Sequence, residues 1–284
     1  MQLSVDSAEM YIPDGVDESA ALSRTTHLAV GAHQDDLEIM AFEGIIACFQ
    51  RRDLWFAGVV VTNGGGSPRS GIYADNTAED MMTVRRVEQK KAAMVGEYGA
   101  QFLLNHPSGA VKDAANPAVT DDLFNILEAT RPEIVYTHNP TDKHDTHVGV
   151  TVKLMEALRR LPEETRPRKV YGCEVWRDLD WMCDTDKVAF DVSAHENLQA
   201  SLLGVFDSQV SGGKRYDLAT LGRRRAHATY HASHDVDTST GIIFAMDLTP
   251  MLTDLSLTLH DLAQQHISRF SAEVSERFRK FGGQ

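Results

Sequence analysis

The chain has 284 residues, 42% hydrophobic and 24% charged, which is enough for one large α/β domain or two small ones with a substantial core. Its 28 basic and 41 acidic side chains give a formal net charge of −13, which disfavours nucleic acid and anionic membranes as partners. No segment approaches the roughly 18 consecutive apolar residues of a membrane span, so we expect none.

Strand-like and helix-like segments then alternate along the chain. Short apolar or β-branched runs predict strands at residues 26–33, 55–62, 100–107 and 133–140. Apolar residues at helical spacing predict helices at residues 36–52, 77–99, 119–131 and 147–161. Helices of this length between strands are typical of the crossovers in a parallel sheet.

The pattern is less regular after residue 165. It predicts strands at residues 169–176 and 241–248, and helices at residues 194–209 and from 251 to about 278. We therefore expect an α/β fold: a Rossmann-like, mostly parallel sheet flanked by helices, with an irregular α+β C-terminal part. Without a repeat or a clear linker, we expect a single domain, 1–284. Its core would span about 26–210, and an extension, 211–284, would shape the pocket.

The cysteines and the N-terminal segment indicate in which cellular compartment the protein works. Cys48, Cys173 and Cys183 are odd in number and lack the spacing of a disulfide framework or a zinc knuckle, which favours a reducing compartment. The acidic segment 1–22 has no basic start and no apolar centre, so it does not predict a signal peptide. We expect a cytoplasmic protein.

Two predicted strands end in clusters of ligand-type side chains. His33 closes the first strand, and Asp35, Asp36 and Glu38 follow at the start of the next helix. After the strand that ends near Pro140, a second set follows: Asp142, His144, Asp145 and His147. Ligands of open parallel sheets bind outside the carboxyl ends of the strands. One aspartate and two histidines around an open position suit a zinc ion that must keep a site for water.

Both clusters resemble the signatures of one family. The run "AHQDDLE" is similar to the "AHPDDxE" signature of the LmbE-like, or PIG-L, zinc-dependent de-N-acetylases, and "DKHDTH" resembles their second, "HPDH"-like signature. The resemblance covers roughly residues 26–210. It implies hydrolysis of the N-acetyl group of an N-acetylglucosamine-type sugar or conjugate, with one Zn²⁺ per chain or another divalent metal in its place.

The resemblance also implies roles for individual residues. It makes His33, Asp36 and His147 the metal ligands and Asp35 the general base that takes a proton from water. His144 would stabilise the oxyanion or protonate the leaving amine.

Two further residues follow from the same resemblance. Asp142 would orient a histidine from the second shell of the metal, and Arg85, three residues before Glu88, would bind substrate.

The chain departs from the family signatures at two places. Gln34 replaces the usual proline, and Asp145-Thr146 replaces the usual Pro-Asp before His147. The second departure removes an aspartate beside a ligating histidine, so Asp145 or Asp142 would have to take its place.

Other polar groups have plainer explanations that we favour. His138 reads as a hydrogen-bonded histidine near a strand end, and the loop 63–71 lacks the spacing of a phosphate-binding loop. His227, His231 and His234 lie at i, i+4 and i+7, but helical phase alone is weak evidence for a second metal.

The leading hypothesis is therefore a zinc hydrolase acting on a small N-acetylated sugar or conjugate. We also expect that the protein can form a homo-oligomer. The alternatives are an amidase on another acyl-amine conjugate and a non-catalytic sugar-binding α/β protein.

Overall fold

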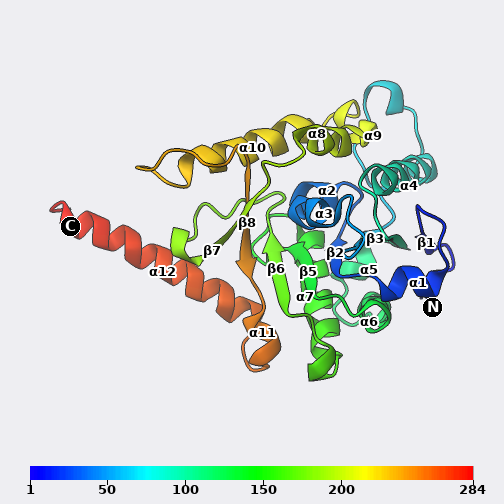
Figure 1. The fold of residues 1–284 in the computed structure, drawn as a ribbon, viewed down its shortest axis with the longest axis horizontal. Coiled ribbons are helices and arrows are strands. Elements are labelled where there is room, and N and C mark those ends of the chain that lie inside the picture. Colours follow the sequence, from blue (N-terminus) through cyan, green and yellow to red (C-terminus); the bar gives the residue numbers. More distant parts are fainter. Residues whose placement is uncertain (284) are drawn as a thin grey trace.

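The computed structural model describes residues 1–283 and centres on one eight-stranded sheet (Figure 1). The strands are β1 (Glu9–Tyr11), β2 (His27–Gly31), β3 (Phe56–Thr62), β4 (Ala100–His106), β5 (Ile134–His138), β6 (Lys169–Cys173), β7 (Lys187–Asp191) and β8 (Ile242–Asp247). Their order across the sheet is β1-β4-β3-β2-β5-β6-β8-β7. The five central strands are parallel, whereas β1, β8 and β7 pair antiparallel with their neighbours. The predicted Rossmann-like, mostly parallel sheet is thus confirmed.

The strand order places a switch point at β2 and β5. From β2 the chain adds β3 and then β4 on one side, and it later crosses over to add β5 and β6 on the other. The connections that leave the carboxyl ends of β2 and β5 therefore diverge. Open parallel sheets bind ligands in the crevice that such a divergence leaves.

Twelve helices surround the sheet within the described residues. They are α1 (Glu18–Ser23), α2 (Asp36–Met40), α3 (Phe42–Cys48), α4 (Ala78–Val95), α5 (Ser108–Lys112), α6 (Ala118–Thr130), α7 (Asp145–Arg160), α8 (Glu196–Gly204), α9 (Asp207–Val210), α10 (Tyr216–Tyr230), α11 (Pro250–Thr253) and α12 (Leu259–Lys280). Alternate residues of β2 serve opposite faces: Leu28 and Val30 pack in the core with α6 and α7, and Ala29 packs in the core with α2, α3, α4 and α8. Two apolar cores thus hold the sheet from both sides.

The predicted helix 36–52 is divided into α2 and α3. Ala41 has φ −112° and ψ 24°, which is outside the helical region. The Arg224 guanidinium on α10 donates to the carbonyl oxygens of Glu38 and Ile39, both at 2.8 Å, and a continuous helix would use those acceptors itself. The break thus depends on a side chain about 185 residues away, which local periodicity does not reveal.

Several other segments differ from the expectation. The predicted helix 194–209 divides into α8 and α9, and the one from 251 to about 278 divides into α11 and α12. The helix predicted at 77–99 ends at Val95 before Gly96, and β1, β7, α1, α5 and α10 were not predicted. The division into one domain with a core and an extension stays a prediction.

The last helix, α12, extends away from the rest of the chain (red in Figure 1). Of its residues only Leu262 is buried. Among residues 1–283, none of the helices is both long and apolar enough to cross a bilayer.

Candidate metal centre and active site

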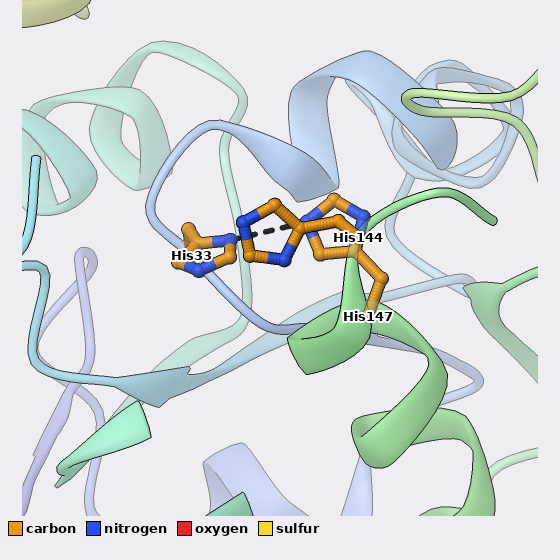
Figure 2. Close-up of side chains that lie close together, drawn as sticks. All are labelled: His33, His144 and His147. Carbon is orange, nitrogen blue, oxygen red and sulfur yellow. Dashed lines mark hydrogen bonds between the residues drawn. The ribbon is translucent and has the colours of Figure 1, made fainter. Parts of the chain in front are cut away.

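The two predicted clusters meet at the switch point of the sheet. His33 lies two residues beyond β2, and Asp36 begins α2. On the neighbouring connection His144 is the N-cap of α7 and His147 lies in its first turn. Figure 2 shows the imidazoles of His33, His144 and His147 gathered between these segments.

Three side chains place their ligand atoms at contact distance. His33 Nδ1 lies 3.1 Å from His147 Nε2 and 3.3 Å from Asp36 Oδ2, and His147 Nε2 lies 3.5 Å from Asp36 Oδ1. Zinc bonds of about 2.0–2.2 Å in a tetrahedral arrangement hold ligand atoms roughly 3.4 Å apart. The spacing of these atoms therefore fits a divalent ion, with the fourth position open.

The charges in this cluster suit a cation as well. Although burial opposes it, the facing His147 and His138 imidazoles hold the pKa of Asp36 well below its usual range. The backbone N–H of His33 also donates to Asp36 Oδ2 at 2.6 Å. Asp36 is thus an ionised carboxylate with a fixed orientation.

Asp142 supports His147 from behind. Its Oδ2 lies 3.6 Å from His147 Nδ1, and its two oxygens accept the backbone N–H groups of His144 and Trp176, both at 3.0 Å. Although burial opposes it, the facing His147 imidazole lowers the pKa of Asp142 to about 2. A carboxylate on the far nitrogen of a ligating histidine fixes the ring and its tautomer. Of the two candidate substitutes for the missing aspartate, Asp142 is the one in this position.

Asp35 is buried beside the cluster and has a free oxygen. Its φ of 99° is in the left-handed region, which aspartate tolerates better than most residues. Its Oδ2 has no hydrogen-bond partner among residues 1–283, although Arg85 Nη2 lies 3.3 Å away. Burial raises the pKa of Asp35 to about 7 in spite of that arginine. These are the properties of a carboxylate that can exchange a proton near neutral pH.

Arg85 lies beneath the turn that carries Asp35. It is only 2% exposed, and Nη2 donates to the carbonyl oxygen of Gln34. Gln34 in turn donates to Thr62 O at 3.0 Å, so the residue that replaces the family proline anchors the turn to β3. A side chain at Gly64, whose φ is +74°, would meet Gln34 Oε1 at 2.6 Å. The substrate-binding role of Arg85 stays a prediction: the residue lines the cavity, and its polar contacts are with the turn, Glu88 and Ser208.

His144 presents one nitrogen to the cavity. Its Nδ1 accepts the backbone N–H of Thr146 at 3.3 Å, which leaves Nε2 as the protonated nitrogen of a neutral ring. Burial, together with the neighbouring His147 and His33, lowers the pKa of His144 to about 4. A neutral imidazole with an Nε2–H group can donate a hydrogen bond to an oxyanion.

His138 lies closer to the cluster than the sequence suggested. Its ring stacks on His147 at 3.9 Å, and Nε2 is 3.4 Å from Asp36 Oδ2. Asp36, His138 and His147 therefore form a second group that could hold a metal, beside the group of His33, His144 and His147. However, Nε2 of His138 already accepts the Ala32 backbone N–H at 2.9 Å. That bond leaves His138 a hydrogen-bonded neighbour of the site.

An open cavity of about 410 Å³ leads to this cluster. Its wall includes Trp176, Tyr216, Lys112 and Lys214, which the sequence did not single out. Lys214 Nζ lies 5.0 Å from the centre of the Trp176 ring, and Tyr216 meets that ring edge-on at 6.1 Å. Trp176 follows the carboxyl end of β6, where open parallel sheets bind ligands, so the sequence could have indicated that it lies near the site. Lys112 and Tyr216 lie at ends of α5 and α10, and Lys214 lies in the loop between α9 and α10, so their placement depends on tertiary packing.

The histidines of α10 do not join the centre. His227 Nε2 pairs with Glu174 at 3.1 Å, and His234 lies past the end of α10 in an exposed segment. Within residues 1–283, neither of the two groups that could hold a metal includes them.

Comparison with known proteins finds a family model that matches part of the chain and solved structures that share its fold. The family described as GlcNAc-PI de-N-acetylase (PIG-L) matches residues 28–158, which contain every predicted ligand. The uncharacterized deacetylase YaiS of Escherichia coli (strain K12) is 27% identical over 145 residues, which are 51% of this chain and 74% of that protein.

Solved structures agree on the architecture. N,N'-diacetylchitobiose deacetylase from Pyrococcus horikoshii is similar with a TM-score of 0.57 and 16% identity, over 78% of this chain and 84% of that chain. GalB, the 4-carboxy-2-hydroxymuconate hydratase from Pseudomonas putida KT2440, is similar with a TM-score of 0.61 and 16% identity, over 79% of this chain and 96% of that chain. At such identities the likeness shows a common fold only. The two solved proteins are named for different reactions, so the reaction of this chain has to be argued from its own site.

Proposed function

Residues 28–158 form a PIG-L (LmbE-like) de-N-acetylase family domain, a family of hydrolytic deacetylases, and from that premise we propose a specific activity. The chain is a zinc-dependent hydrolase that removes the N-acetyl group from an N-acetylglucosamine-type sugar or conjugate and releases acetate and a free amine. It works in the cytoplasm, where the free thiols of Cys48, Cys173 and Cys183 would stay reduced.

One observation carries this proposal. His33 Nδ1 and His147 Nε2 stand 3.1 Å apart, and each has one oxygen of Asp36 within 3.3–3.5 Å. The residue next to Asp36, Asp35, has a carboxylate oxygen without a hydrogen-bond partner among residues 1–283. A binding protein without catalysis has no need for a buried base next to a metal site. The arrangement therefore favours hydrolysis over sugar binding alone.

The reaction adds water to an amide carbon and breaks its C–N bond. A divalent ion held by His33, Asp36 and His147 would polarise the carbonyl and make water acidic enough to attack near neutral pH. Asp35 takes the proton of the attacking water and returns it to the departing nitrogen, because the residue lines the cavity and its pKa lies near 7. His144 Nε2–H donates to the oxygen that gains negative charge.

The cavity wall offers a surface for the sugar. Trp176 and Tyr216 present aromatic rings beside the centre, and such rings pack well against the C–H face of a pyranose. Lys112 and Lys214 at the same wall would favour a substrate that carries a negative group.

Acetate release tests the proposal directly. The protein, supplied with about one equivalent of zinc, is incubated with N-acetylglucosamine, its phosphates and several glycosides, and acetate and free amine are measured together. We expect equal amounts of both products from at least one substrate, and none after the metal is chelated. A zinc-loaded protein that releases acetate from no member of this panel would contradict the proposed activity.

A further inference from the structure

Two side chains of α4 bind both polar atoms of the peptide group between Gln34 and Asp35. Arg85 Nη2 donates to the carbonyl oxygen of Gln34. Gln89 Oε1 accepts the backbone N–H of Asp35 at 3.3 Å. That carbonyl and that N–H belong to one planar peptide group, and Arg85 and Gln89, four residues apart, lie on the same face of α4. One helix face thus fixes the plane of the peptide that leads into Asp35.

The orientation of the Gln89 amide is set by fully buried neighbours. Its Nε2 donates to Glu38 Oε1 at 2.8 Å and to Gln101 Oε1 at 3.3 Å. Gln101 presents that oxygen because its own Nε2 donates to the carbonyl oxygen of Phe102 at 2.9 Å. With these acceptors on the Nε2 side, the oxygen of Gln89 points toward the N–H of Asp35.

The backbone of Asp35 needs such support because its conformation is strained. Its φ of 99° lies in a region that residues other than glycine rarely adopt. A conformation of this kind costs free energy and persists only where the surrounding contacts hold it. Rotation of the peptide plane before Asp35 would change that φ and move the carboxylate. No backbone carbonyl of residues 1–283 accepts the Asp35 N–H, so the acceptor is Gln89.

We propose that Gln89 is a positioning residue for the general base: together with Arg85, it holds the peptide before Asp35 and thereby keeps the Asp35 carboxylate beside the metal centre. The inference rests on the hydrolase activity and on the role of Asp35 proposed above. Gln89 is fully buried and does not line the cavity. Its loss should therefore affect the base and leave substrate and metal binding nearly unchanged.

A change of Gln89 to Leu removes the acceptor and keeps a buried side chain. We expect kcat of zinc-loaded Gln89→Leu on an N-acetylated substrate to fall by about tenfold to a hundredfold, because a reacting group displaced by about 1 Å can cost that much. KM should stay within about threefold and the zinc content at the wild-type value, because neither depends on the position of the base.

Gln101→Leu is the matched control. It makes the same change at an equally buried position of the same network, and it leaves the bond between Gln89 and Asp35 in place. Its kcat should stay within about threefold of the wild type. An equal fall of kcat in both variants would show that only the packing of the network matters, and the inference would be wrong.

A double variant shows whether Gln89 acts through Asp35. In the Asp35→Asn protein the base is already lost, so adding Gln89→Leu should lower the residual kcat by no more than about twofold. If the second change costs as much in Asp35→Asn as it does in the wild type, Gln89 acts independently of Asp35 and is not its positioning residue.

Exchange of the Asp35 amide hydrogen, followed by NMR, tests the contact without any substrate. In the wild type it should be slower than in an unfolded peptide, and in Gln89→Leu roughly threefold to tenfold faster than in the wild type, which is the worth of one neutral hydrogen bond. The Ile39 amide, which donates to the Asp35 carbonyl at 3.0 Å, is the internal reference. An unprotected Asp35 amide in the wild type would contradict the inference even if the variants fail to fold.

The combined results separate this inference from the proposed activity. Faster Asp35 exchange in Gln89→Leu with a wild-type kcat would overturn the positioning role and leave the hydrolase standing, and equal exchange in the two proteins would overturn it as well. The same change in exchange, without hydrolysis of any substrate by the wild type, would support the hold on Asp35 and refute the proposed activity.

Discussion

Asp35 and Asp36 are adjacent, yet the backbone gives their carboxylates different surroundings. The left-handed φ of Asp35 turns its side chain toward Arg85 and the cavity, and Asp36 faces His33 and His147 from the first turn of α2. One residue is thus free to move a proton, whereas the other is held among imidazoles. This local geometry supports the separate functions that we propose for the two neighbouring aspartates.

Replacing Asp35 by Asn should therefore separate catalysis from metal binding. The variant keeps the size of the side chain and loses its basic oxygen, so we expect bound zinc to stay and kcat to fall by about 10²–10⁴. Asp36→Asn is the matched comparison, and it should bind zinc more weakly and recover part of its activity in excess metal. Zinc content and kcat of both variants are the measurements. Zinc loss in the first variant with retention in the second would reverse the assigned roles.

At this scale the sequence predicted the ligand types and which strand ends carry them. His33, Asp36 and His147 could be proposed because their spacing follows a known signature and strand ends meet at one edge of a parallel sheet. It could not place Trp176 in the cavity wall or Arg224 on the carbonyls at the end of α2, because their positions depend on contacts between distant segments.

The contact between α3 and β5 shows how an element is held against the sheet. Tyr136 on β5 donates its hydroxyl to the half-buried Glu43 on α3. Burial raises the pKa of Glu43 above its ordinary value near 4.5. The packing of this helix therefore includes a carboxyl group that the fold prefers protonated.

The sign of the resulting pH dependence is fixed. Between the unfolded and the raised folded pKa of Glu43, the folded state holds more protons, so this group lowers stability as pH rises through that window. We expect Glu43→Gln to gain stability relative to the wild type on going from about pH 4 to pH 8. Denaturant midpoints across this range are the measurement. Glu128→Gln, at an exposed position on α6, is the control. If the denaturant midpoints of both variants depend on pH in the same way, the raised pKa of Glu43 is not the cause.

The elements themselves were predictable where periodicity was strong. The central strands and α4, α6 and α7 lie within a few residues of the predicted ranges, since each buries one regular apolar pattern. The break at Ala41 and the division between α8 and α9 were not, because long-range contacts and local turns overrule a continuous helical pattern. Short elements such as β1 and β7 carry too few residues for a period to show.

At the scale of the whole molecule, the last helix, α12, exposes an apolar face. On α12, Ile267, Phe270, Val274 and Phe278 recur at spacings of three and four residues, and they are 42%, 36%, 36% and 62% exposed. The outer part of the helix forms the ion pair of Arg269 with Asp186 at 2.8 Å, a surface contact of small value. Homo-oligomer formation stays a prediction, and this face is where it can be tested.

A chain that ends at His266 should unfold with a free energy within about 1 kcal/mol of the full chain, because the removed residues bury little against the sheet domain. Urea unfolding at two protein concentrations and the mass in solution are the measurements. A concentration-dependent loss of stability, with a smaller particle after truncation, would instead show that a second copy covers the apolar face of α12.

The proposed activity depends on a metal held by His33, Asp36 and His147, and the metal content per chain tests it most directly. The wild type, His147→Gln and the exposed-site control His260→Gln are each given about one equivalent of zinc, desalted and analysed. We predict about one ion per chain in the wild type and the control, and roughly a tenth or less in His147→Gln, with acetate release lost in proportion. Full zinc occupancy in His147→Gln, or acetate release by a wild-type protein that holds no metal, would contradict the account.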